Sequence, residues 1–122
     1  MENSFRNELE ISLAGVKILL RPTFENMANT ESKLGGLPYL AWKFSRTGKE
    51  SATLTDCAQL IYFNQAANNP ADPNKKALSL EEIWALVSQE GVNVLKPAMT
   101  FLALMTAGNK MAVDLSDNQK KS

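Results

Sequence analysis

The sequence contains no histidine and only one cysteine, Cys57. Without histidine the chain lacks the most frequent general base and the commonest metal-ligating side chain of proteins. A single cysteine can form neither a disulfide within the chain nor a cage of thiolate ligands. These absences exclude histidine-dependent catalysis, thiolate metal binding and disulfide-stapled folds.

The chain also lacks an excess of charge of one sign and a long apolar run. Thirteen basic residues balance thirteen acidic ones, so no overall field favours nucleic acid or an anionic membrane. No apolar stretch approaches the roughly 20 residues of a membrane span, and residues 1–4 do not begin a secretion signal. We therefore expect a soluble protein of a reducing cytoplasm, with no membrane or nucleic-acid partner.

What is present is enough apolar content for one folded domain. The chain has 122 residues, of which 44% are apolar, an ordinary share for a globular protein. We expect a single domain over residues 1–108. Residues 109–122 are mostly polar, and we expect them to form a mobile tail.

Residues 8–21 have the alternation of a β-hairpin. Apolar and polar residues alternate over 9–13 and again over 16–20, with Ala14 and Gly15 between them as the turn. Alanine is poorly suited to a turn that needs positive φ, so the turn type stays open. The expected cross-strand pairs are Leu13–Val16, Ile11–Ile18, Leu9–Leu20, Ser12–Lys17 and Glu8–Arg21.

A helix is expected directly after the hairpin. Pro22 ends the strand because it cannot donate to a ladder, and Thr23 is a natural N-cap. Glu25 places negative charge in the first turn, where the helix dipole favours it. The helix should stop at Gly35. Its predicted inward stripe is Phe24, Met27, Ala28, Glu31 and Leu34.

Caps and apolar spacing indicate about four further short helices. The second begins at residues 37–38 and ends at Gly48, and the third runs from a Thr53 cap to about Ala67. The third has an apolar surface too broad for a solvent-facing helix, so it is either central or meets a partner. Its predicted inward side is Leu54, Cys57, Ala58, Ile61 and Gln65, and that of the second helix is Leu37, Leu40, Ala41 and Phe44.

A polar loop at 68–76 separates these from the last two helices. Ser79 and Glu82 have the spacing of a capping box, which starts a fourth helix that ends at Gly91. A fifth helix begins near residues 93–96 and ends at Gly108. The predicted inward residues are Leu80, Ile83, Trp84 and Val87 on the fourth helix, and Ala98, Phe101, Leu102 and Met105 on the fifth.

The predicted fold class is therefore α+β and mainly α, with an N-terminal β-hairpin followed by about five short helices packed as a small bundle. The hairpin ends in the step Leu20-Arg21-Pro22-Thr23-Phe24, and the first helix stops at Leu34-Gly35. This arrangement resembles the tail assembly chaperones of long-tailed phages, and most of all the branch found in gene transfer agents. The resemblance extends from about Glu8 to Gly108.

The resemblance implies a non-enzymatic protein of the bacterial host cytoplasm. Such a chaperone binds the tape-measure protein and holds it while subunits of the tail-tube protein polymerise. Neither a cofactor nor a metal is implied. The physical requirement is an exposed apolar surface, and the residues predicted to supply it are Leu60, Ile61, Phe63, Phe101, Leu104 and Met105.

The candidates for catalysis each have a structural interpretation that fits better. Glu81 and Glu82 point about 100° apart on a helix, and Glu82 is already the capping-box partner. Cys57 has no histidine to lower its pKa and suits a small buried hydrophobe. Asp56 and Asp72 lack metal-ligand companions at a recognisable spacing. We predict that the protein is not an enzyme.

Two other functions remain as alternatives. A structural tail or connector component, retained in the particle, could add the hairpin to a neighbouring sheet. A DNA-binding regulator that uses the third and fourth helices as a split helix-turn-helix is the weakest alternative, because the loop between them is too long for the usual turn and the net charge is zero. Separately, Trp42, Lys43, Arg46 and Lys49 form a small aromatic and basic patch that could bind nucleic acid. That patch fits a solvated helix face better. A homo-oligomer stays open, because the hairpin must pack either on the helices or on another copy.

Overall fold

The computed structural model describes residues 8–68 and 76–106. Its elements are β1 (Leu9–Leu13), β2 (Val16–Leu20), α1 (Phe24–Leu34), α2 (Leu37–Phe44), η2 (Gly48–Glu50), α3 (Leu54–Phe63), η3 (Ala66–Asn68), α4 (Leu80–Glu90), η4 (Gly91–Val94) and a helical segment over 95–106. The predicted class, α+β and mainly α with an N-terminal hairpin, is confirmed. Most of the predicted loop at 68–76, the predicted domain end at 108 and the predicted tail at 109–122 lie outside the described residues.

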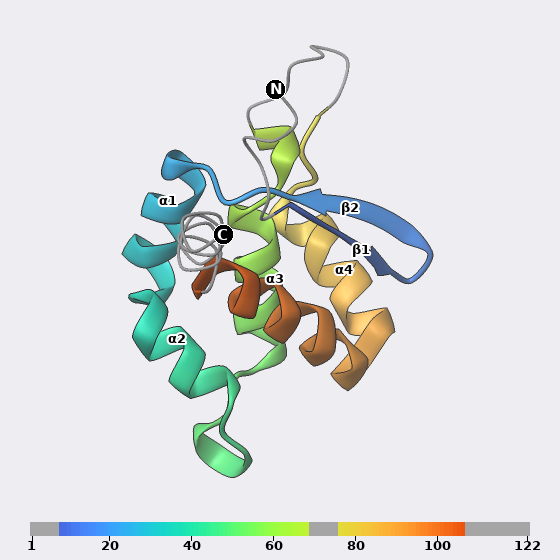
Figure 1. The fold of residues 1–122 in the computed structure, drawn as a ribbon. Helices are drawn as coiled ribbons and strands as arrows, with labels where there is room; N and C mark the ends of the chain where they lie inside the picture. The colour runs from blue at the N-terminus through green and yellow to red at the C-terminus, as the bar shows by residue number, and fades with distance from the viewer. Residues whose placement is uncertain (1–7, 69–75, 107–122) are drawn as a thin grey trace, which may run out of the picture.

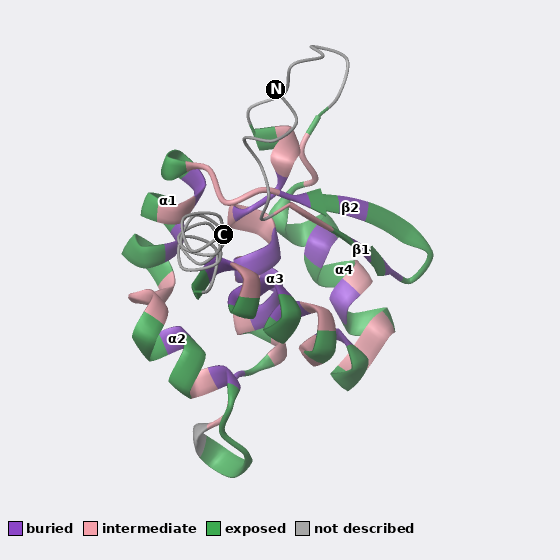
Figure 2. Cartoon of the chain, in the orientation of Figure 1, coloured by how far each residue is buried: buried purple, intermediate pink, exposed green. Residues whose placement is uncertain are grey.

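Helix α3 lies at the centre of the molecule. Figure 1 shows α1 and α2 on one side of α3 and α4 on the other, with the segment 95–106 crossing α3. Figure 2 shows that buried residues are concentrated on α3, whereas α2 buries only Leu40 and Phe44. Within the described residues, no helix is long and apolar enough to cross a membrane.

Strands β1 and β2 pair antiparallel in the predicted register. Leu9 faces Leu20, Ile11 faces Ile18 and Leu13 faces Val16, with Ser12 opposite Lys17. The Arg21 Nε donates to a carboxylate oxygen of Glu8 at the open end, also as predicted. Ile11, Leu13, Ile18 and Leu20 are buried. A shift by one residue would turn this set toward water, so burial of one face holds the register.

The hairpin turn is of a type that the sequence left open. Ala14 has φ 48° and Gly15 has φ 85°, and two consecutive positive values are typical of a type I′ turn. The left-handed conformation costs alanine about 1 kcal/mol. The Ala14 N–H donates to Glu90 Oε1 at 2.8 Å. The end of α4 therefore helps to hold the turn in this conformation.

Helix α1 has the predicted cap but buries a different face. The Asn26 N–H donates to Thr23 Oγ1 at 3.1 Å, which confirms Thr23 as the N-cap. The buried residues are the polar Asn26 and Thr30, and Phe24 is 89% exposed. The predicted stripe is therefore wrong for Phe24, and likewise for Ala28 and Glu31, which are exposed, whereas Met27 and Leu34 pack against the core. This face of α1 covers backbone polar groups, so it needs hydrogen-bonding side chains.

The buried polar residues of α1 form a network with the end of α3. The Asn26 side-chain amide donates to the carbonyl oxygens of Arg21 at 2.8 Å and of Gln65 at 3.2 Å. The Thr30 hydroxyl donates to the Asn26 carbonyl, and the Asn64 amide donates to Thr30 Oγ1, both at 2.8 Å. Because buried carbonyl groups are costly without partners, these bonds fix α1 against the hairpin exit.

The segment after α3 extends the hairpin sheet. Leu20 forms an isolated antiparallel bridge with Gln65, and the Arg21 N–H donates to the Asn64 carbonyl at 2.8 Å. The Gln65 amide also pairs with the backbone of Leu78, donating at 2.9 Å and accepting at 2.8 Å. The Gln65 side chain therefore connects the end of α3 to the segment that precedes α4.

Helices α2 and α3 are both shorter than predicted. Helix α2 ends at Phe44 rather than at Gly48, and α3 ends at Phe63 rather than near Ala67. Leu40 and Phe44 are buried as predicted, but Ala41 is exposed. After α2 a turn at Ser45 and two residues without regular structure lead to the 3₁₀ turn η2, and after α3 the 3₁₀ turn η3 begins only at Ala66.

The last two helices begin as predicted. The Ser79–Glu82 capping box is present, with bonds of 2.8 and 3.1 Å. On α4, Ile83 and Val87 are buried, whereas Leu80 and Trp84 are exposed, which contradicts their predicted burial. In the segment 95–106 the predicted inward residues are all buried: Ala98, Phe101, Leu102 and Met105.

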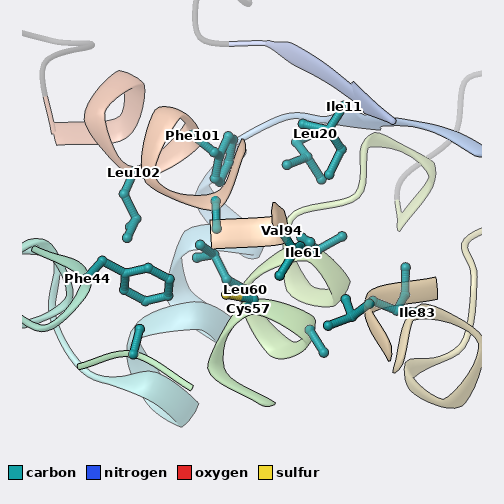
Figure 3. Close-up of a cluster of buried hydrophobic side chains, with 14 of the residues drawn as sticks. Ile11, Leu20, Phe44, Cys57, Leu60, Ile61, Ile83, Val94, Phe101 and Leu102 are labelled. Atoms are coloured by element: carbon teal, nitrogen blue, oxygen red, sulfur yellow. The ribbon is translucent and has the colours of Figure 1, made fainter. Parts of the chain in front are cut away.

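The core forms where α3 meets the hairpin, α4 and the segment 95–106. In Figure 3, Leu60 and Cys57 of α3 lie at the centre, with Phe101 on one side and Ile83 on another. Leu60, Cys57, Phe101 and Ile83 have no solvent exposure. Phe44 of α2 extends the same cluster toward Leu102.

Candidate functional site: exposed apolar surfaces

Most of the residues predicted to bind a partner lie in the core. The prediction that they form an exposed surface is wrong for four of them: Leu60, Ile61, Phe101 and Met105 are buried. Phe63 and Leu104 are partly exposed. The apolar surface of α3 is broad because other elements pack on several sides of this helix. Of its two interpretations, a central position or contact with a partner, the structure therefore shows the first.

The exposed large apolar side chains come instead from the ends of the hairpin and from the outer faces of the helices. The structure exposes Val16, Leu19, Phe24, Tyr39, Trp42, Leu80, Trp84, Val92 and Met99. Sequence spacing had assigned Phe24, Leu80 and Trp84 to the core. Two of these residues lie on the same surface at three places: on α2, on α4, and in a groove between η4 and the segment 95–106. Each of these surfaces could contact a partner.

The first surface, called the α2 face, consists of Tyr39, Trp42, Lys43 and Arg46. The Tyr39 and Trp42 rings stack with their centroids 6.0 Å apart, and they are 48% and 46% exposed. Arg46 lies 4.9 Å from the centre of the Trp42 ring, and Lys43 Nζ lies 5.8 Å from that of Tyr39. Cations over ring faces are attracted to them, so the α2 face presents ordered aromatic rings and positive charge.

Gly35 allows the Tyr39 ring to lie where it does. Gly35 has φ 111°, a conformation that L side chains rarely adopt, and a Cβ there would approach Tyr39 Cδ2 to 2.8 Å. The α1–α2 turn therefore positions the first ring of the α2 face through a close backbone approach.

Lys43 and Asp56 tie the α2 face to the start of α3. Lys43 Nζ lies 3.0 Å from Asp56 Oδ2, and the hydrogen bond that Lys43 donates to Asp56 raises the pKa of Lys43. Burial opposes ionisation of Asp56, but hydrogen bonds from Thr53 and Lys43 together hold its pKa below the usual 3.8. Asp56 is also the box partner of the Thr53 cap, accepting from the Thr53 N–H at 2.9 Å.

Replacing Asp56 with alanine is expected to lower the free energy of unfolding by about 1–2 kcal/mol at pH 7, because the cap and the ion pair are both lost. A carboxyl group whose pKa is lower in the folded protein than in the unfolded chain stabilises the fold at pH values above its unfolded pKa. This stabilisation is lost as pH falls through the pKa of the folded state. The difference from wild type should therefore shrink below pH 3.8. Urea unfolding between pH 7 and values below pH 3.8 measures this difference in stability, with Thr55→Ala as the control because Thr55 is an exposed neighbour. A loss of stability that does not change with pH would contradict the role of the Asp56 carboxylate.

The second surface, called the α4 face, consists of Leu80, Glu81 and Trp84. These residues lie three and four positions apart and are neighbours on one side of the helix. Trp84 is 42% exposed, and Leu80 and Glu81 are exposed as well. The α4 face therefore combines apolar area with negative charge.

The third surface is a shallow groove at the start of the segment 95–106. Val92 and Met99 are 72% and 44% exposed, and the partly buried Leu95 also lines the groove. The groove is lined by Val92, Asn93, Leu95, Lys96, Met99 and Thr100. The groove lies just before Phe101 in the sequence. The predicted fifth helix therefore does contribute to an exposed apolar surface, but through Met99 rather than through Phe101 and Met105.

The residues considered for catalysis have structural environments. Cys57 is fully buried, and burial followed by the charge of Asp56 raises its pKa to about 12. Glu82 accepts the Ser79 N–H in the capping box. Among the described residues, no group of three or more acidic, cysteine or histidine side chains is gathered as a metal site requires. Asp72 lies outside the described residues.

Comparison with known proteins adds no relative. No family model matches the chain, and neither the curated proteins nor the solved structures contain a significant match to it.

Proposed function

We propose that this protein is a non-enzymatic assembly chaperone for the tail of a phage, prophage or gene transfer agent. In this role it acts in the bacterial host cytoplasm, where it binds the tape-measure protein and helps the tail-tube protein assemble. The sequence resemblance over residues 8–108 supports the family. The step from hairpin to capped helix that carries the resemblance is present in the fold, with Thr23 as the cap.

The exposed groove at residues 92–100 supports a binding role most directly. A chaperone for an aggregation-prone client needs apolar surface that stays accessible in its folded state. Val92 and Met99 provide such surface on ordered elements, and the methionine side chain adapts its shape to different partners. We place the client contact in this groove rather than on the predicted residues of the core.

Co-expression with the tape-measure polypeptide tests the proposal. The wild-type chain should keep the client in the soluble fraction, and Val92→Ser combined with Met99→Ser should reduce this at least several-fold. Phe24→Ser is the matched control, since Phe24 is more exposed, begins α1 and is not among the residues that line the groove. Failure of the wild-type chain to solubilise the client would refute the chaperone role, and equal losses in both variants would refute the groove.

A structural tail or connector component is the second candidate, and the hairpin favours it. In the described part of the chain the sheet order is β1-β2, and no described strand pairs with the outer edge of β1. An open edge can accept a strand from a neighbouring subunit. Mass spectrometry of purified particles separates the two functions, because a component is retained in a fixed ratio and a chaperone is absent.

A further inference from the structure

Two segments of this electrically neutral chain each carry charged residues of one sign only. Residues 32–49 contain Lys33, Lys43, Arg46 and Lys49 and no acidic residue. Residues 77–95 contain Glu81, Glu82 and Glu90 and no basic residue. The first segment includes all of α2, and the second includes all of α4. We call these segments the basic side and the acidic side. Glu31 and Glu50 border the first, where Lys43 also pairs with Asp56, and Lys76 and Lys96 border the second.

Each of these sides also exposes a tryptophan. On the basic side, Trp42 stacks on Tyr39 and lies under Arg46. On the acidic side, Trp84 lies one turn after Leu80 and near Glu81 on the helix surface. Tryptophan, tyrosine and arginine are the residues that contribute most often to the energy of protein interfaces.

The two sides face away from each other across the molecule. Figure 1 shows α2 and α4 on opposite sides of α3. Leu40 and Phe44 turn one face of α2 inward, and Ile83 and Val87 do the same for α4. The α2 face and the α4 face of one molecule therefore cannot meet each other, but each can meet its complement on another copy.

We propose that copies of this chain associate head to tail, with the α2 face of one copy bound to the α4 face of the next. Trp42 and Tyr39 of one copy pack against Leu80 and Trp84 of the next, and Arg46 approaches Glu81. Such a contact is heterologous, so repetition gives a closed ring or an open chain of subunits. The proposal concerns contacts between copies and does not depend on the identity of a client.

The physical basis is complementarity of charge combined with burial of exposed rings. Opposite charges across the contact favour this pairing, and like charges disfavour α2 on α2 or α4 on α4. A net charge of zero at neutral pH means that copies do not repel each other as wholes. Added salt screens such exposed charges, so association should weaken as salt concentration rises.

The first experiment measures mass in solution by size-exclusion chromatography with light scattering over a range of protein concentrations. The wild-type chain should form species larger than a monomer. Trp42→Ser and Trp84→Ser should each weaken association by about tenfold or more, the effect expected for a buried tryptophan anchor. Phe24→Ser, which removes an exposed ring outside both faces, should leave association unchanged, and circular dichroism should show that all three variants remain folded.

A mixing experiment then tests the head-to-tail geometry. The Trp42→Ser chain keeps its α4 face, and the Trp84→Ser chain keeps its α2 face. An equal mixture should form a 1:1 dimer and nothing larger, because only one intact pair of faces is available. In a single chain, Arg46→Glu combined with Glu81→Arg should restore the association that either change removes.

The proposal is overturned if the wild-type chain is monomeric at all concentrations, or if the two tryptophan variants remain monomeric when mixed. It is also overturned if only one of the two tryptophan substitutions affects association, since a symmetric contact between identical faces gives that result. Loss of client binding in Trp42→Ser with a monomeric wild-type chain would assign the α2 face to the client instead.

Discussion

Replacing Phe101 with alanine is expected to lower the free energy of unfolding by about 3–5 kcal/mol, the range found for large aromatic residues removed from protein cores. The Phe101 side chain has no solvent exposure and lies beside the α3 residues at the centre of the core. Its removal therefore leaves a cavity between the segment 95–106 and α3. Since whole domains are stable by only about 5–15 kcal/mol, this single change could remove most of the stability.

Urea unfolding followed by circular dichroism measures this effect. If Phe101→Ala does not fold well enough, Phe101→Leu should still fold with a smaller loss, because most of the volume is kept. Leu104→Ala is the matched control in the same segment. Because Leu104 is partly exposed, its replacement should lower the free energy of unfolding by less than that of Phe101. A loss below about 1 kcal/mol for Phe101→Ala would contradict its place in the core and return it to the predicted binding surface.

Replacing Asn26 with aspartate is expected to lower the free energy of unfolding by about 3 kcal/mol or more at pH 7, although the two side chains have nearly the same shape. The Asn26 amide donates to the carbonyl oxygens of Arg21 and Gln65 in a buried site. A carboxylate cannot donate, and it would face two oxygens without water. Its position in the first turn of α1 favours negative charge by at most about 1 kcal/mol, which does not offset the loss.

The pH dependence of this variant distinguishes the network from a general packing effect. A protonated carboxyl can donate to one of the two carbonyls, so the new carboxyl should have a folded pKa above its usual value of about 3.9. The deficit should therefore be smallest below that pH and grow as pH rises through the folded pKa. Asn29→Asp, an exposed change on the same helix, should cost little at any pH. A deficit equal at pH 3 and pH 7 would contradict the role of the amide.

Local patterns predicted the hairpin and the helix starts well. The register of β1 and β2 follows from alternation that leaves one choice for the buried face, and slippage by one residue would expose Ile11 and Ile18. The caps at Thr23, Thr53 and Ser79 each satisfy backbone groups within three residues. Signals of this kind need no information about distant parts of the chain, so they can be read before the fold is known.

Apolar spacing predicted burial less well, for a physical reason. A helical stripe shows which side chains share a face, but the amount of that face that is covered depends on neighbours from elsewhere in the chain. Trp84 is therefore exposed beside the buried Ile83, and Phe101 is buried where a binding surface was predicted. The network around Asn26 was missed because its partners, the carbonyl oxygens of Arg21 and Gln65, come together only after α3 docks.

The sequence by itself determined the α+β class, the hairpin register and the helix caps. Each of these depends on residues within a few positions of one another or on composition along a segment. The tertiary structure decided that α3 is central, that α1 packs through polar side chains, and that the α2 and α4 faces lie on opposite sides. These features depend on contacts between segments distant in sequence, and burial of a side chain is a property of all the segments around it.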